Sequence, residues 1–159
     1  MKKLAIAALV AWLGFLVPRP AEGQARFGAQ VSWGDDTDFG LGARLGFPFG
    51  GELKRKGIEG LATFDYFFPD GFDYWEITAN GLYHFTQGTK AKPYVGGGVV
   101  FGRFSTASPG FDDSDFGLNL IGGLRFKAQE RLLPFIEGRL ELKDGSQFVL
   151  AAGVYFGKP

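Results

Sequence analysis

Residues 26–33 read RFGAQVSW, and residues 39–47 read FGLGARLGF. In both stretches apolar residues alternate with Gly, Ser, Gln or Arg, so one face of an extended chain is apolar and the other is small or polar. A period of two is the signature of a β-strand. The alternation recurs in six further segments: 58–68, 74–85, 94–104, 116–127, 133–143 and 147–156. We therefore predict eight strands of about ten residues each, the length that a tilted strand needs to cross a membrane.

The connectors between these segments are short and rich in turn-forming residues. Examples are GDDTD (34–38), FPDGFD (68–73) and KDGS (143–146). Short connectors favour antiparallel neighbours, because a parallel crossover needs a dozen or more residues. An even number of strands lets the first and last strands pair and close the sheet. The predicted fold is all-β, an eight-stranded antiparallel up-and-down transmembrane β-barrel.

The N-terminus has the pattern of a secretory signal peptide. Lys2 and Lys3 precede an apolar run over residues 4–17, and small residues follow at Gly23 and Ala25. This order predicts cleavage after Ala25. The apolar run is shorter than the ~20 residues that a membrane-spanning helix needs. The predicted division is residues 1–25 as signal peptide and residues 26–159 as barrel.

The composition excludes several kinds of site. The chain has no cysteine, so it forms neither a disulfide nor a Cys-ligated metal site. The 17 basic and 17 acidic residues become a net charge of about −2 once the signal peptide is removed. That balance gives no reason to expect nucleic-acid binding.

The polar face of the predicted strands is unlike a sheet surface in water. Every Lys of the mature chain lies in a connector or at a strand end, and the polar face holds Gly, Thr, Asn and charges of both signs. By alternation, eight charged residues share this face: Arg44, Glu59, Asp65, Glu76, Arg125, Glu137, Arg139 and Glu141. Buried charges must be paired, so we predict an interior charge network, to which Arg103 is a candidate fourth arginine.

The apolar face is rich in aromatic residues near the strand ends. The main ones are Trp33, Phe39, Phe68, Trp75, Tyr83, Phe85, Phe116, Phe126 and Phe156. Two such belts are typical of the aromatic girdles of a transmembrane β-barrel. The alternative is a soluble barrel of inverted polarity, whose aromatic residues surround an apolar ligand.

The two predicted rims differ in charge. The connectors after the odd-numbered strands hold Asp35, Asp36, Asp38, Asp70, Asp73, Asp112, Asp113, Asp115 and Asp144, with Lys143. The connectors after the even-numbered strands hold Lys54, Arg55, Lys56, Lys90, Lys92, Lys127 and Arg131, against Glu52 and Glu130. One rim is therefore acidic and the other basic.

Several stretches together resemble a known family. They are the signal peptide, KPYVGGGVVFGRF (92–104), DFGLNLIGGLRF (115–126), LLPFIEGRLEL (132–142) and FVLAAGVYF (148–156). Over residues 26–159 the chain resembles the OmpA-like and opacity-type outer-membrane β-barrels of Gram-negative bacteria. The resemblance implies a monomer in the outer membrane, in contact with its lipids, including lipopolysaccharide. It also implies that the insertion machinery recognises the last strand, which ends at Phe156, and that the acidic rim is extracellular.

Two acidic stretches are nearly identical, DDTDFGL (35–41) and DDSDFGL (112–118). We interpret them as one structural corner used twice, in which Asp and Ser or Thr cap a turn and Phe anchors at the membrane interface. The alternative is weak binding of Ca²⁺ or Mg²⁺ by carboxylates. The candidate ligands are Asp35, Asp36, Asp38, Asp112, Asp113 and Asp115.

The function predicted from these features is non-enzymatic, with an envelope-structural or surface-interaction role and no cofactor. An eight-stranded barrel is filled by its own side chains, so no wide pore is expected. An acyl-transfer site needs a Ser beside a His, and His84, the only His, has no Ser next to it in the sequence. The alternatives are a narrow porin or ion channel and a soluble periplasmic barrel that carries a lipid-like ligand.

Overall fold

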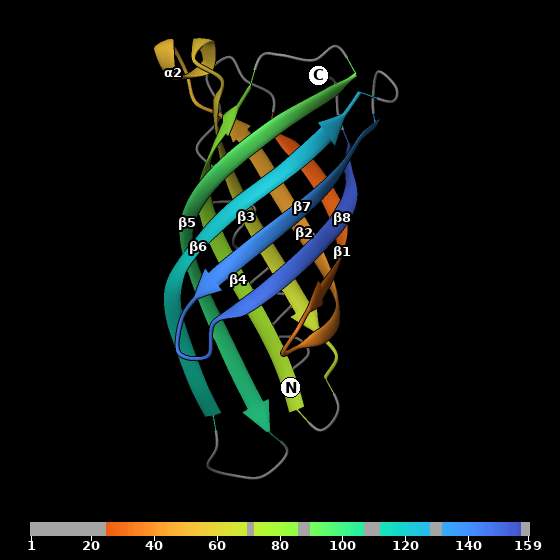
Figure 1. Ribbon diagram of the computed structural model, residues 1–159, viewed down its shortest axis with the longest axis vertical. Coiled ribbons are helices and arrows are strands. Elements are labelled where there is room, and N and C mark those ends of the chain that lie inside the picture. The colour runs from red at the N-terminus through yellow and green to blue at the C-terminus, as the bar shows by residue number, and fades with distance from the viewer. Residues whose placement is uncertain (1–24, 70–71, 86–89, 107–111, 128–131, 157–159) are drawn as a thin grey trace.

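The protein is a closed barrel of eight antiparallel strands (Figure 1). The computed structural model describes residues 25–69, 72–85, 90–106, 112–127 and 132–156. The strands are β1 (Arg26–Gly34), β2 (Asp38–Pro48), β3 (Ile58–Phe67), β4 (Phe72–His84), β5 (Ala91–Thr106), β6 (Asp112–Phe126), β7 (Leu132–Leu142) and β8 (Gln147–Phe156). Each strand pairs with the next, and β1 pairs with β8 to close the sheet. The predicted fold and strand order are confirmed.

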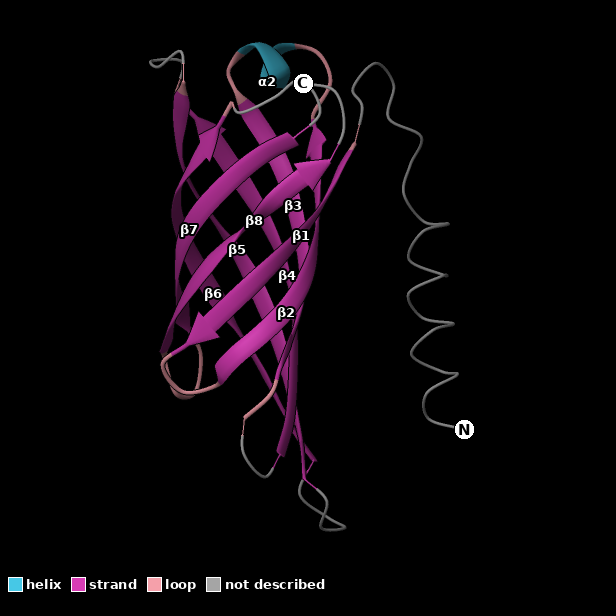
Figure 2. Ribbon diagram, turned by 90° about the vertical axis from the view of Figure 1, so that its right-hand side faces the viewer, coloured by secondary structure: helices cyan, strands magenta, loops and turns pink. Residues whose placement is uncertain are grey.

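Strand β1 begins, and strand β8 ends, at the basic rim of the barrel. Phe27 of β1 pairs with Phe156 of β8. The same end carries a short helix, α2 (Glu52–Arg55), in the connector between β2 and β3 (Figure 2). No helix in the described ranges is long and apolar enough to cross a membrane. The predicted signal peptide, except for Ala25, lies outside the described residues.

The strands are less uniform in length than predicted. Strands β4, β5 and β6 have 13, 16 and 15 residues, whereas β1 has 9. The extra residues lie at the acidic rim, where the β5–β6 ladder continues to the pair Ser105 and Asp112. This part of the sheet projects beyond the neighbouring strands (Figure 1). Part of the predicted loop between β5 and β6 is therefore regular strand.

The two acidic stretches adopt different structures, so the prediction of one corner used twice is wrong. In the first, residues 35–37 form a turn between Gly34 and Asp38, which pair with each other. Asp38 has a φ of 57°, a left-handed conformation that Asp tolerates better than most residues. In the second, the whole stretch belongs to β6 and pairs with β5.

The partner strand explains this difference. Phe39 pairs with Trp33, and only Gly34 remains in β1 beyond that pair. Phe116 pairs with Phe101, and β5 continues for five further residues, 102–106. The same local sequence therefore turns where its partner ends and extends where its partner continues.

Glycines on the inner surface allow β4 and β5 to pack closely. An added Cβ at Gly98 would lie 2.0 Å from the backbone oxygen of Ala79, whereas one at Gly81 would meet nothing within 4 Å. We expect Gly98→Ala to lower the free energy of unfolding by about 1–3 kcal/mol, because overpacking forces the backbone to move. Urea unfolding in detergent micelles, followed by tryptophan fluorescence, measures this loss. Gly81→Ala is the control, and equal stability of the two variants would contradict the expected close packing.

Candidate functional site

The barrel interior is the candidate site, because charged side chains gather there. All eight residues predicted to share the polar face are buried: Arg44, Glu59, Asp65, Glu76, Arg125, Glu137, Arg139 and Glu141. They extend from five strands, β2, β3, β4, β6 and β7, so closure of the sheet brings them together. They form three ion-paired clusters along the barrel.

The outer cluster, near the acidic rim, is centred on Arg139. Its Nη2 lies 3.0 Å from Asp65 Oδ2 and 3.0 Å from Glu76 Oε1. The side chain of Arg139 is fully buried, and both carboxylates are also fully buried. Gln30 donates to Asp65 at 2.6 Å, and the Ser32 hydroxyl donates to it at 2.8 Å. Two buried polar side chains therefore hold Asp65 in place beside Arg139.

Lys143 completes the outer cluster. Its Nζ lies 2.9 Å from Glu141 and 3.8 Å from Glu76, and its side chain is 2% exposed. The candidate fourth interior cation, Arg103, lies on the outward parity of β5 and is exposed, so that prediction is wrong. The signal that identifies Lys143 is parity, because it continues the inward series of Arg139 and Glu141 one step past the end of β7.

The middle cluster joins β2 to β7. Arg44 Nη2 donates to both carboxylate oxygens of Glu137, at 2.9 and 3.0 Å. The Tyr94 hydroxyl donates to the same carboxylate at 2.7 Å. The Arg44 guanidinium also lies 3.7 Å from the centre of the Phe135 ring, a cation–π contact.

The inner cluster, near the basic rim, surrounds Glu59. Arg125 binds its carboxylate with two hydrogen bonds, of 2.9 and 3.0 Å. His84 Nε2 lies 3.0 Å from the same carboxylate, and Arg26 lies 3.8 Å from it. His84 thus contacts a carboxylate that a bidentate arginine already holds, which is the geometry of a structural pair.

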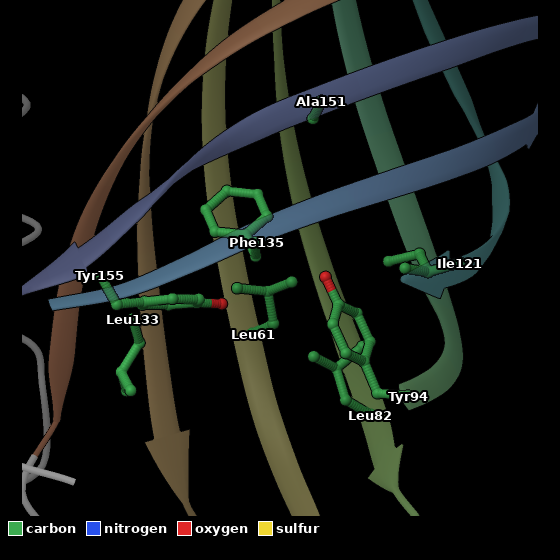
Figure 3. Packing of buried hydrophobic residues seen from close by; sticks show 8 residues of the cluster. All are labelled: Leu61, Leu82, Tyr94, Ile121, Leu133, Phe135, Ala151 and Tyr155. Carbon is green, nitrogen blue, oxygen red and sulfur yellow. The ribbon is translucent and has the colours of Figure 1, made fainter. Parts of the chain in front are cut away.

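Apolar side chains fill the space between the charged clusters. One group of eight converges inside the barrel from β3 to β8 (Figure 3): Leu61, Leu82, Tyr94, Ile121, Leu133, Phe135, Ala151 and Tyr155. The Tyr155 ring lies 5.2 Å from the Arg44 guanidinium and 4.5 Å from that of Arg125, so it separates the middle and inner clusters.

A second apolar group closes the outer end. Phe67, Tyr74 and Val149 are fully buried there, and Phe104 packs against them. The rings of Tyr74 and Phe104 stack with centroids 4.4 Å apart. Lys143 contacts the Tyr74 hydroxyl and lies beside its ring. Aromatic groups therefore occupy the lumen between the outer charge cluster and the acidic rim.

The outer surface of the wall is apolar, with aromatic residues at two levels. The predicted girdle residues near the acidic rim are Trp33, Phe39, Phe68, Trp75 and Phe116, and those near the basic rim are Tyr83, Phe85, Phe126 and Phe156. All are exposed except Trp75 and Phe126, which are half-buried. Between the two levels, Leu118, Leu120, Leu140 and Leu150 are each more than 40% exposed. The wall is therefore apolar outside and charged inside.

The acidic stretches do not form a metal site in the described part of the chain. No group of three or more His, Asp or Glu side chains there is arranged to hold a metal ion. Asp35 instead accepts a hydrogen bond from the backbone N–H of Phe148, at 2.9 Å. Asp113 accepts one from the backbone N–H of Ser114, at 2.8 Å. The side chain of Asp112 lies outside the described part.

Solved structures show the same architecture. The chain has the fold of the small eight-stranded outer-membrane β-barrels. It is similar to the N-terminal β-barrel domain of Pseudomonas aeruginosa OprF, with a TM-score of 0.65, 15% identity, and coverage of 85% of this chain and 98% of that chain. It is similar to Neisserial surface protein A, with a TM-score of 0.62, 16% identity, and coverage of 83% and 94%.

A third similar structure is Ail, the attachment invasion locus protein of Yersinia pestis. The TM-score is 0.53 at 16% identity, over 86% of this chain and 100% of that chain. No protein-family model matches the chain, and no curated protein matches it. At these identities the comparisons show the fold.

Proposed function

We propose that this protein is a non-enzymatic barrel of the outer membrane of a Gram-negative bacterium, with a structural or surface-interaction role in the envelope. The observation that carries the proposal is the polarity of the wall. Leucines at mid-height are exposed, whereas arginines and carboxylates are buried inside. Such a surface is unfavourable in water and favourable in lipid. The same polarity favours this proposal over the alternative of a soluble barrel with an apolar ligand cavity.

The aromatic belts support a membrane position with the acidic rim on one side and the basic rim on the other. We propose that the belts contact outer-membrane lipids, including lipopolysaccharide at the extracellular side, and that the barrel is monomeric. Phe156 is half-exposed at the end of β8 and pairs with Phe27 and Leu132. Its place at the last strand supports recognition of this strand by the insertion machinery.

The interior chemistry supports a structural role. A catalytic His needs a nucleophile or a bound water within reach, whereas His84 contacts Glu59. The buried carboxylates lie against arginine or lysine, as charges that stabilise a polar core do. The second candidate function, a narrow ion channel, rests on the charged clusters, which line the lumen at three levels.

Conductance across a planar bilayer distinguishes these two functions. We expect the wild-type barrel to give no stable open level, because aromatic groups fill the lumen on both sides of the middle cluster. Tyr74→Ala, which removes a ring from the outer apolar group, is expected to show more frequent brief openings. Stable, long-lived openings of the wild type would contradict the structural role and favour the channel.

A further inference from the structure

The outer part of β6 has an open edge. The β6–β7 ladder runs from Leu118 paired with Leu142 to Arg125 paired with Phe135. Residues 112–117 of β6 pair with β5 on one side. On the other side, no strand of the described part of the chain pairs with them. Within the described ranges, the projecting sheet therefore ends in a strand whose second edge pairs with no other strand.

The backbone groups on this edge can be identified. The N–H of Ser114 donates to Asp113 Oδ1, so it does not point into the ladder with β5. The N–H and C=O groups of one residue in an antiparallel strand point to the same side, and successive residues alternate. The backbone N–H and C=O groups of residues 112, 114 and 116 therefore point to the open edge.

The two faces beside this edge differ in chemistry. Asp113 and Asp115 lie on one face, and Ser114 and Phe116 lie on the other. Phe116 is 67% exposed. The acidic side chains protect the edge against a second copy of the chain, because like charges would meet. They complement a strand that places cationic residues on one face and apolar residues on the other.

We propose that residues 112–116 of β6 are a docking site for an extended basic segment of another protein, which adds to the sheet as a further strand. Backbone hydrogen bonds from residues 112, 114 and 116 give the affinity, with the Ser114 N–H exchanging its bond to Asp113 Oδ1 for one to the added strand. Asp113, released by this exchange, and Asp115 select Lys or Arg at alternate positions. Phe116 packs against the apolar residues between them. The proposal deepens the surface-interaction role and rests on the proposed function for the exposure of this rim to partners.

The probe is a fluorescein-labelled peptide of alternating Lys and Val, titrated against the full barrel in zwitterionic detergent micelles. Fluorescence anisotropy is expected to show saturable binding of one peptide per barrel. Ser114→Pro removes the N–H that faces the open edge, at a position where a sheet tolerates Pro. We expect it to weaken binding by about tenfold or more, since a strand hydrogen bond is lost and the added ring hinders close approach. Ser114→Ala keeps the N–H and is expected to bind like the wild type.

Charge is tested by a second matched pair. Asp113→Asn is expected to weaken binding, whereas Asp36→Asn, which removes the same charge from the β1–β2 turn, is expected to leave it unchanged. Equal binding by the Pro and Ala variants, or equal weakening by the two Asn variants, would overturn the proposal in favour of general attraction to the acidic rim. Absence of saturable binding, or a dimer without peptide, would also overturn it.

The fold of each variant is checked by the mobility shift of unheated and boiled samples in SDS. Absence of peptide binding by a wild-type barrel that shows this shift refutes the docking site and leaves the proposed function intact. A wild-type chain that lacks the shift refutes the proposed function itself.

Discussion

Replacing Arg139 by Met is expected to lower the free energy of unfolding by about 3–5 kcal/mol, because it leaves the buried Asp65 without its cation and Glu76 with only the more distant Lys143. Arg139 Nη2 lies 3.0 Å from both Asp65 and Glu76, and all three residues are fully buried. Met retains much of the apolar volume of the arginine side chain, so the loss of stability measures mainly the effect of removing the charge. Urea unfolding of the folded barrel in lipid vesicles, followed by tryptophan fluorescence, measures it.

Two controls define the cause of this loss. Arg103→Met removes an exposed arginine on the outer surface and is expected to change the free energy of unfolding by less than about 1 kcal/mol. The triple variant Arg139→Met, Asp65→Asn, Glu76→Gln removes both uncompensated charges and is expected to recover part of the stability. A loss of less than about 1 kcal/mol for Arg139→Met alone would contradict a structural role for the outer cluster.

Replacing Leu120 by Arg is the second large effect. Leu120 is 56% exposed and lies in β6 midway between the girdle residues Phe116 and Phe126. In a lipid bilayer, an arginine at this depth costs about 2–4 kcal/mol. On a soluble protein, an exposed Leu replaced by Arg has little effect on stability. Leu120→Arg is therefore expected to destabilise a membrane barrel that is apolar outside, and to leave the stability of a soluble barrel nearly unchanged.

Leu53 provides the matched control, because it is 44% exposed in α2 at the basic rim, away from the apolar belt. Leu53→Arg is expected to unfold at the same urea concentration as the wild type in vesicles of the same lipid. If Leu120→Arg and Leu53→Arg are equally stable, the wall at Leu120 does not face lipid.

The alternation of the sequence predicts the strands and their two faces because both are local properties. A side chain's face follows from counting along one strand, so Arg44, Glu76 and Glu141 are assigned to the interior without knowledge of their partners. Lys143 shows the limit of this reasoning. Its position after β7 predicts a place in the connector at the acidic rim, although its parity continues inward.

The partners of the interior charges cannot be predicted in this way. Arg44 and Glu137 are 93 residues apart, and Arg139 and Asp65 are 74 residues apart. Which pairs meet depends on the stagger between strands around the closed barrel, and this stagger is a property of the whole sheet. The two acidic stretches show the same dependence, because their partner strands differ in length.

The most direct test of the central claim, a closed barrel with lipid outside and charges inside, is a paired gel. The full-length chain is expressed in a Gram-negative host, the outer membrane is isolated, and unheated and boiled samples are compared in SDS. The account predicts a band in the outer-membrane fraction whose mobility shifts on boiling. Soluble periplasmic protein whose mobility does not change on boiling would contradict it.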